Sequence, residues 1–454
     1  MHFFINKLIY LFYGLVIIPF VYIIKNIDFS ENFSLILMHV FIGIISVAII
    51  IRKDCGMMTQ SAGVFFLLFF SLSPINELNN EIIYWEGEFF NDKIRFLGVS
   101  TTFLFVFFFW LALNIKSFPS DKDNPLTRRL FNLKAISSKK VKWLLLSLVS
   151  GLLLLLYFYE MNLQALFFKG GEPSEQLNVD SKILYLFIEY FLRPMLFNLG
   201  LVYVLLGKKV LYRVFLILII FFVASPTGIS RFLVAALYMP LIIVMFMGQH
   251  KKNQIVLSHN TYLYPSILLF GLLYIFPLLD IFRYFSFEKV INFSFFSHHN
   301  DGSFDAYQMY LRALDVGSVN YGYGFLGAIL FFIPRFFWLS KPVTSGIEIS
   351  QLSNLRLENV SMPIIGEFYL NFWFFGVILG GILLALLFKK IDLYYLRYKF
   401  SNLSLGHLVY FQLATLIMIN MRGGFLSSFA YTCSILMTWI LLALFFCSKS
   451  SHKY

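Results

Sequence analysis

Twelve blocks of mostly apolar residues follow one another along the chain, most of them about 18 to 22 residues long. A helix of about 20 residues crosses the ~30 Å hydrocarbon core of a bilayer. Because backbone hydrogen bonds must close within each spanning segment, the pattern predicts an all-α, polytopic integral membrane protein. We expect spans at about 3–24, 33–51, 59–76, 96–115, 143–159, 184–206, 210–226, 231–248, 261–282, 364–388, 404–421 and 424–447.

Composition supports this interpretation. Of the 454 residues, 59% are hydrophobic and 13% are charged, whereas soluble domains carry about 25% charged residues. This excludes an ordinary cytosolic enzyme. Three cysteines without close spacing argue against a disulfide framework and a zinc site. The first apolar block is too long for a signal-peptide core and lacks a small-residue cleavage site, so we expect it to be retained.

The net charge of +12 reflects topology rather than affinity for nucleic acid. Most of the 36 Lys and Arg residues fall in alternate connections, including eight between Lys116 and Lys142, whereas most of the 24 Asp and Glu residues fall in the others. Positive residues gather in cytoplasmic loops. The sequence therefore predicts twelve spans with both termini in the cytoplasm.

One outer connection, residues 283–363, is far longer than the others and divides the chain into spans 1–282, this loop, and spans 364–454. Loops longer than about 12–15 residues are usually functional or disordered. This one is rich in Tyr, Phe, Trp and Gly and is expected to fold on the membrane surface. Its segment Phe325–Trp338 is apolar enough for an interfacial or re-entrant helix.

Several short sequence motifs lack the surrounding structure that their usual function requires. Gly322, Gly324 and Gly327 fit G-x-G-x-x-G, but a dinucleotide site requires that string inside a βαβ unit. His298, His299, Asp301 and Asp305 have no second cluster to complete a metal coordination sphere. There is no Walker A motif either. We therefore expect neither a metal nor a cofactor.

Ionisable residues in or beside the outer ends of spans carry the functional signal, because charges there are costly and usually pair or line a wet cavity. Arg193 follows Glu189 by four positions, which fits either an ion pair or a functional site. Arg231 follows a Pro- and Gly-containing turn and opens a span. It could bind an anion at a helix N-terminus or extend to the membrane surface.

Arg335 and Lys341 lie six residues apart among aromatic residues and prolines in the long loop. Two such cations suit an anionic headgroup beside a lipid tail, although an interfacial aromatic belt with surface cations is the alternative. Arg422 lies in the connection between the last two expected spans. Glu367 opens the span 364–388, where it could be a general base or an acid favoured by the helix dipole. Gly376 and Gly380 have the spacing of a helix-packing face.

These features resemble the bacterial O-antigen or oligosaccharide repeat-unit polymerases, the Wzy family. The resemblance covers the hydropathy profile with its large late loop, and is sharpest at Pro226–Arg231, Ile333–Pro342 and Gly366–Asn371. Arg335 to Gly346 also fits the Arg-x10-Gly pattern described for such polymerases. A second copy of that pattern starting at Arg193, Arg231 or Arg312 is absent.

The resemblance implies a C-type glycosyltransferase architecture in the bacterial inner membrane, with its active site facing the periplasm. The glycan would move en bloc from undecaprenyl diphosphate onto a new lipid-linked repeat unit, and a chain-length regulator would be a plausible partner. Within this scheme the diphosphate would be bound by Arg231, Arg335, Lys341, Arg422 and Arg193. The base would be Glu367, with Asp301, Asp305 and His299 in reserve, and Tyr310, Tyr321, Tyr323 and Trp338 would stack on sugars or simply pack.

Two other functions fit the same profile. An O-antigen ligase uses the same donor and also has a large late loop. A lipid-linked oligosaccharide flippase belongs to a different class, and its short loops contrast with residues 283–363.

Overall fold

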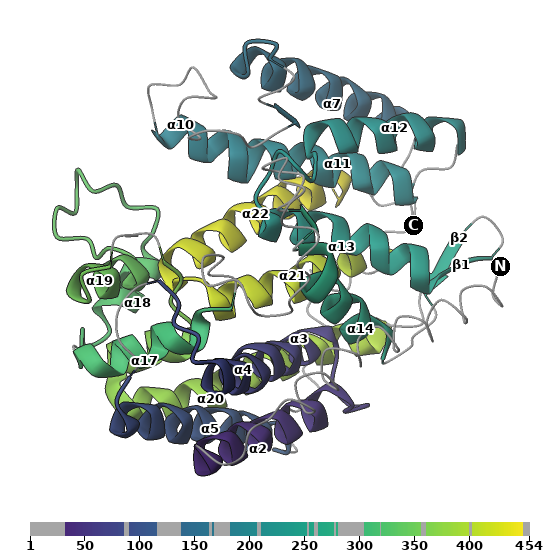
Figure 1. Ribbon diagram of the computed structural model, residues 1–454. Coiled ribbons are helices and arrows are strands. Elements are labelled where there is room, and N and C mark those ends of the chain that lie inside the picture. Colours follow the sequence, from purple (N-terminus) through teal and green to yellow (C-terminus); the bar gives the residue numbers. More distant parts are fainter. Residues whose placement is uncertain are drawn as a thin grey trace.

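The computed structural model describes residues 32–85, 90–115, 138–162, 166–167, 182–206, 210–251, 254–257, 262–276, 278–279, 304–317, 319–355, 360–398 and 402–447. Within these ranges nearly every element is a helix, in agreement with the predicted all-α class (Figure 1). The expected span 3–24 lies outside the described residues.

The N-terminal helices are α2 (Phe33–Ile50), a continuous helix Met57–Asn80 and α5 (Asp92–Leu113). The second of these comprises α3 (Met57–Phe65), the π-helical segment η1 (Phe66–Leu72) and α4 (Ser73–Asn80). Asn91 caps α5, since its side chain accepts a hydrogen bond from the Ile94 amide.

The middle of the chain forms helices over each range that the hydrophobic pattern predicts there. They are α7 (Ser138–Phe158), the run of α10 (Lys182–Phe187), η2 (Ile188–Leu192) and α11 (Arg193–Leu206), then α12 (Val210–Val223), α13 (Arg231–Met247), α14 (Leu263–Phe270) and η3 (Gly271–Ile275). The pattern missed a small antiparallel hairpin between α13 and α14. Its strands are β1 (Gly248–Lys251) and β2 (Gln254–Leu257).

The C-terminal part begins with three short helices from the long loop, α17 (Ala306–Val316), α18 (Tyr323–Ile329) and α19 (Ser345–Leu352). They are followed by α20 (Ile364–Tyr398), α21 (Leu405–Arg422) and α22 (Phe425–Cys447). Figure 1 shows the three short helices together, beside one end of α20 and of α22. The predicted helix Phe325–Trp338 was too long, because the helix ends at Ile329 and Pro334 cannot continue it.

Six helices of the described part are long and apolar enough to cross a membrane, by length and composition. They are Phe33–Ile50, Met57–Asn80, Asp92–Leu113, Leu184–Leu205, Ile364–Tyr398 and Phe425–Phe445. Leu146–Phe158, Arg231–Met247 and Leu263–Ile275 are apolar but shorter. The chain therefore has the character of an all-α membrane protein.

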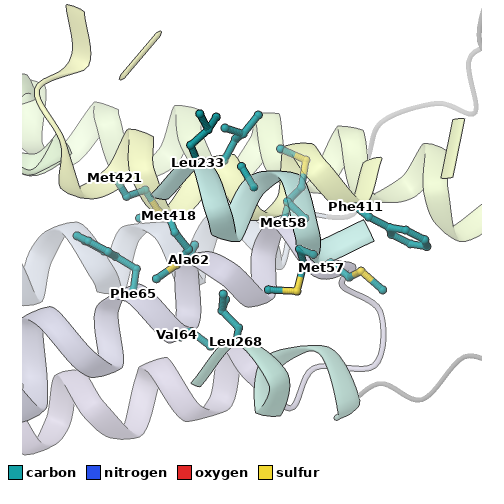
Figure 2. Packing of buried hydrophobic residues seen from close by; sticks show 14 of the residues in the cluster. Met57, Met58, Ala62, Val64, Phe65, Leu233, Leu268, Phe411, Met418 and Met421 are labelled. Atoms are coloured by element: carbon teal, nitrogen blue, oxygen red, sulfur yellow. The ribbon is translucent and has the colours of Figure 1, made fainter. Parts of the chain in front are cut away.

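Helix α3 lies at the centre of the packing. Every residue from Met57 to Phe65 is buried. Figure 2 shows this helix enclosed by side chains from three others: Leu233 of α13, Leu268 of α14 and Phe411 of α21. The three polar side chains of α3 are buried with hydrogen-bond partners: Thr59 donates to Asp392, Gln60 to the Ile50 carbonyl and Ser61 to the Ala414 carbonyl.

Helix α20 is broken near its N-terminal end. Phe372 and Trp373 have non-helical dihedral angles, and Trp373 has φ 57° and ψ −155°. The loop before α18 supplies a donor to the freed backbone, because the Asn320 amide donates to the Leu370 carbonyl at 2.6 Å. A Cβ at Gly376 would lie 2.3 Å from the Phe368 carbonyl oxygen, so only glycine fits where the two segments meet.

The expected packing face of Gly376 and Gly380 thus contacts α20 itself. A Cβ at Gly380 would meet the Phe368 ring at 2.4 Å. The small residues allow the segment before the break to approach the segment after it. They do not mark an interface with a separate helix at these contacts.

Asp392 joins the other end of α20 to the start of α3. Its buried carboxylate accepts hydrogen bonds from the backbone amides of Gly56, Met58 and Thr59, from the Thr59 hydroxyl and from Tyr410 Oη. Amides at a helix N-terminus lack partners within the helix and favour a negative charge. Asp392 therefore fixes α3 against α20 and α21.

We expect Asp392→Ala to lower the free energy of unfolding by more than about 3 kcal/mol, because several buried donors lose a charged acceptor at once. The control is Asp54→Ala. Asp54 forms an ion pair with Arg52 but is 57% exposed, and such pairs contribute about 0–1 kcal/mol. Thermal unfolding in detergent should show a large fall in midpoint for Asp392→Ala alone; equal shifts in both variants would contradict this role.

Candidate functional site at the connection between α21 and α22

Three of the ionisable residues singled out in the sequence meet around the connection Arg422–Phe425. Arg422 ends α21, and its Nη2 lies 3.3 Å from Asp305 Oδ1. Asp305 immediately precedes α17 and is 1% exposed. Glu367 approaches the same connection from α20. The structure thus brings together residues separated by up to 117 positions in the sequence.

Glu367 is buried, and both of its carboxylate oxygens accept hydrogen bonds. Oε2 accepts from Ser345 Oγ at 2.7 Å, and Oε1 accepts from the Phe425 amide at 2.7 Å. Phe425 is the first residue of α22, so the carboxylate lies at the N-terminus of that helix. The sequence predicted that Glu367 interacts with the dipole of its own helix, α20. In the structure its carboxylate also lies at the positive end of the dipole of α22.

Asp305 is held on both sides. Trp85 Nε1 donates to Oδ2 at 2.8 Å, while Arg422 lies against Oδ1. Burial raises the pKa of the Asp305 carboxyl, and Arg422, the next largest influence, counteracts part of this shift. Asp305 therefore fixes the position of the Arg422 guanidinium, which is one third exposed.

A third buried carboxylate continues this polar cluster. Glu77 of α4 accepts hydrogen bonds from Ser73 Oγ at 2.7 Å and from Gln308 Nε2 at 3.1 Å. Gln308 lies on α17 within one turn of Asp305. Glu77 and Gln308 also line a small cavity between α2, α4, α5 and α17, together with His39, Arg95 and Tyr307.

Arg335 and Lys341, expected to bind a diphosphate, instead donate to backbone carbonyls of their own loop. Arg335 Nη1 and Nη2 donate to the carbonyls of Lys341 and Pro342 at 2.7 and 3.0 Å. Lys341 Nζ donates to those of Phe331 and Ile333 at 2.7 and 2.8 Å. Burial, followed by the charge of Arg335, lowers the pKa of Lys341. Both cations therefore organise this loop.

The loop nevertheless lies next to the connection. A Cβ at Gly424 would be 3.6 Å from Thr344 Cβ and 3.7 Å from Glu367 Oε1. Thr344 follows Lys341 by three residues and caps α19, whose first residue is Ser345. The backbone of this loop thus holds Arg335 and Lys341 near the candidate site. Among the hydrogen bonds and ion pairs of the described residues, neither side chain contacts Asp305 or Glu367 directly.

Arg193 is fully buried and forms the ion pair with Glu189 that the i,i+4 spacing predicts, with Nε 3.3 Å from Oε1. Tyr159 Oη also donates to Glu189, and the Arg193 guanidinium lies 4.8 Å from the centre of the Tyr159 ring. This pair joins α7 to η2 and α11. Its position within the protein favours the structural interpretation over diphosphate binding.

Arg231 is the first residue of α13 and is partly buried. Its neighbour Phe232 stacks with Tyr431 of α22 and with Tyr190 of η2, at ring-centre distances of 5.8 and 6.2 Å. Arg231 is thus placed near the second turn of α22, whereas Arg422 lies just before its first turn. The cations predicted to act together are spread along this helix.

The aromatic residues weighed for sugar stacking differ in their surroundings. Tyr310 is buried and donates to Thr101 Oγ1 at 2.7 Å, so it packs in the interior. Tyr323 donates to the Ser340 carbonyl and accepts from Trp338 Nε1, which stabilises the loop. Tyr321 is 88% exposed. His299 and Asp301 lie outside the described residues.

Sequence reasoning missed Ser345, Trp85 and Asn371. Asn371 accepts from the Phe325 amide and donates to the Glu367 carbonyl, which fixes the short segment that carries Glu367. Asn371 falls in the string Gly366–Asn371 that carries the family resemblance, and this was an available signal. Ser345 and Trp85 carry no local signal, since their role depends on contacts with distant residues.

The arrangement offers one partly exposed arginine beside buried carboxylates at the end of three apolar helices. Arginine can stabilise a phosphate or another oxyanion, and a buried carboxylate can accept a proton. Each oxygen of the Glu367 carboxylate accepts one of the hydrogen bonds described above and keeps a second lone pair with which it can accept from an incoming hydroxyl. In comparisons with known proteins, no family model, curated protein or solved structure matches the chain.

Proposed function

We propose that this protein is a glycosyltransferase that polymerises undecaprenyl-diphosphate-linked oligosaccharide repeat units into O-antigen polysaccharide. The proposal places it in the bacterial inner membrane with twelve spans, both termini in the cytoplasm and the site facing the periplasm. It rests on the resemblance described above. The structural observation that supports it most is the meeting of Arg422, Asp305 and Glu367 at the connection between two apolar helices.

Within this proposal the roles of the residues become more specific. Arg422, positioned by Asp305, stabilises the leaving diphosphate by electrostatics. Glu367 accepts the proton of the acceptor sugar hydroxyl. Arg335 and Lys341 act indirectly, because they shape the loop that leads into Ser345. The acceptor oxygen would form its bond to the anomeric carbon as the bond from that carbon to the diphosphate breaks. Glu367 would take the hydroxyl proton and Arg422 would stabilise the charge on the departing diphosphate.

The test of function is a gel of surface lipopolysaccharide from a strain that lacks the gene. We expect the ladder to collapse to core plus a single repeat unit, because export and ligation continue without polymerisation. Complementation with the intact gene should restore the ladder. Loss of the single-repeat band would contradict the proposal: long glycan left on the lipid carrier would indicate a ligase, and its absence a flippase.

A further inference from the structure

The loop that follows α18, residues Leu330–Leu339, exposes an unusual number of large apolar side chains. We call this segment the aromatic loop. Phe332 is 66% exposed, Phe336 84%, Phe337 78% and Leu339 88%. Contiguous exposed apolar surface of this kind marks an interaction site when it occurs on a protein in water.

Part of the backbone of the aromatic loop is hydrogen-bonded within the loop and its flanks. The Phe337 and Trp338 amides donate to the Pro334 carbonyl, and the Ile333 amide donates to the Leu330 carbonyl. Lys341 Nζ binds the carbonyls of Phe331 and Ile333. Each of these hydrogen bonds lowers the cost of moving the backbone groups concerned from water into the boundary of a bilayer.

The position of α22 sets the depth of the aromatic loop. Phe425–Cys447 has 23 residues, so at 1.5 Å per residue it spans about 34 Å, close to the thickness of a bilayer core. In a bilayer that α22 spans, its first residue lies at one boundary of the membrane. Phe331 packs edge-on against Phe429, four residues into this helix, with ring centres 6.3 Å apart. The loop is thus about 6 Å below the end of the span at this contact.

The break in α20 exposes further apolar residues close by. Phe372 is 45% exposed, Trp373 50% and Phe375 69%. A series of ring contacts links the two regions: Phe331 contacts Phe429, Phe429 contacts Phe425, and Phe325 contacts both Phe425 and Phe372. The aromatic loop is therefore continuous with other exposed aromatic residues at the ends of two apolar helices, in the manner of an interfacial aromatic belt.

The charged residues around the aromatic loop also favour contact with a lipid surface. The stretch 317–347 contains Arg335 and Lys341 and no acidic residue. Arg335 is exposed, and its guanidinium donates hydrogen bonds to the carbonyls of Lys341 and Pro342. Cations flanking exposed aromatic residues favour the boundary between anionic headgroups and acyl chains.

We propose that the aromatic loop inserts into the outer boundary of the bilayer next to α22, with Phe336, Phe337 and Leu339 among the acyl chains. This inference depends only on the membrane character of the chain and is independent of the proposed polymerase activity. It also assigns the sequence around Arg335 to membrane anchoring, with the backbone held by the two cations.

Nitroxide labelling of the full-length protein tests the insertion. The three cysteines, Cys55, Cys433 and Cys447, are replaced by alanine, and a single cysteine is introduced as Phe336→Cys or Phe337→Cys. The protein is reconstituted in vesicles of phosphatidylethanolamine and phosphatidylglycerol. Collision of the label with oxygen, which concentrates in acyl chains, is compared with collision with a water-soluble nickel chelate.

Two matched positions calibrate the measurement. Phe41→Cys lies in the middle of α2, where Phe41 is 48% exposed on a candidate span. Gln351→Cys is an exposed polar position on α19, in the same long loop. The spectrum of the Phe41 label also reports whether the helical part of the protein without its three native cysteines is folded.

We expect labels at positions 336 and 337 to collide several-fold more often with oxygen than with the nickel chelate, as at position 41, and the reverse at position 351. Labels that respond like position 351 would place the aromatic loop in water and overturn the proposal. Immobile labels protected from both reagents would also overturn it, since another protein surface, such as a second copy of the chain, would then cover the loop.

Discussion

Glu367→Gln is expected to reduce polymerisation by about 100-fold or more while leaving the protein folded. A positioned general base contributes about 10²- to 10⁴-fold to the rate. Glutamine has nearly the same volume as glutamate, its carbonyl oxygen can still accept from the Phe425 amide, and its NH2 can donate to Ser345 Oγ. The substitution therefore removes the basic group and keeps both contacts that the structure shows for the carboxylate.

The measurement is the rate at which purified protein in proteoliposomes converts lipid-linked repeat units into polymer, together with the midpoint of thermal unfolding. Ser345→Ala is the matched control. It removes one donor to Glu367, which should cost about 1 kcal/mol of stability, but it leaves the carboxylate in place. We expect its activity to fall by only a few-fold.

A different result would reassign Glu367. If Glu367→Gln stays within a few-fold of the unaltered protein while Glu367→Ala unfolds, the carboxylate is a cap for α22 and the base lies elsewhere. The proposed polymerase function would survive that outcome, since it depends on the gel of surface lipopolysaccharide described above.

The pair Asp305 and Arg422 is the second case with a large expected effect. Removing one partner of a buried ion pair costs about 3–5 kcal/mol. Arg422 is one third exposed, so we expect about 2 kcal/mol for Arg422→Gln. Asp305→Asn should cost less, because asparagine can still accept a hydrogen bond from Trp85 Nε1 at the same site.

The double variant separates structure from catalysis. Residues in contact show interaction energies of about 0.5–3 kcal/mol, so the double variant should be less destabilised than the sum of the single ones. Its polymerisation should nevertheless remain at least about 100-fold reduced, because the cation proposed for the diphosphate is absent. Recovery of both stability and activity would show that Arg422 serves only to neutralise Asp305.

The hydrophobic pattern predicted the helices well because length and apolarity are local properties. In the described part, helices occupy each of the eleven ranges expected after residue 32, although only six meet the length and apolarity of a full span. The hairpin of β1 and β2 and the break at Phe372–Trp373 were missed. Gly376, three residues after Trp373, was interpreted as part of a helix-packing face and not as a sign of the break. Contacts from Asn320 and Phe325 stabilise the break.

The candidate site could be predicted only as a set of residue types. Charge in or beside apolar segments identified Glu367, Arg422 and Arg193 before any contact was known, whereas Asp305 was only a reserve candidate for the base. The spacing of Glu189 and Arg193 correctly predicted their ion pair, because four residues make about one helical turn. The same reasoning assigned Arg335 and Lys341 to a ligand, whereas they bind carbonyls that no sequence pattern reveals as available.

The sequence by itself determined that the chain is a helical membrane protein, since a bilayer requires apolar segments of about 20 residues with internally satisfied backbones. It also determined which charged residues were costly enough to need partners. Only the tertiary structure decided which residues are those partners. Asp305 meets Arg422 across 117 positions, and Glu367 meets the first amide of α22 across 58. Such contacts depend on how helices pack, and packing is decided by the shapes of many side chains together.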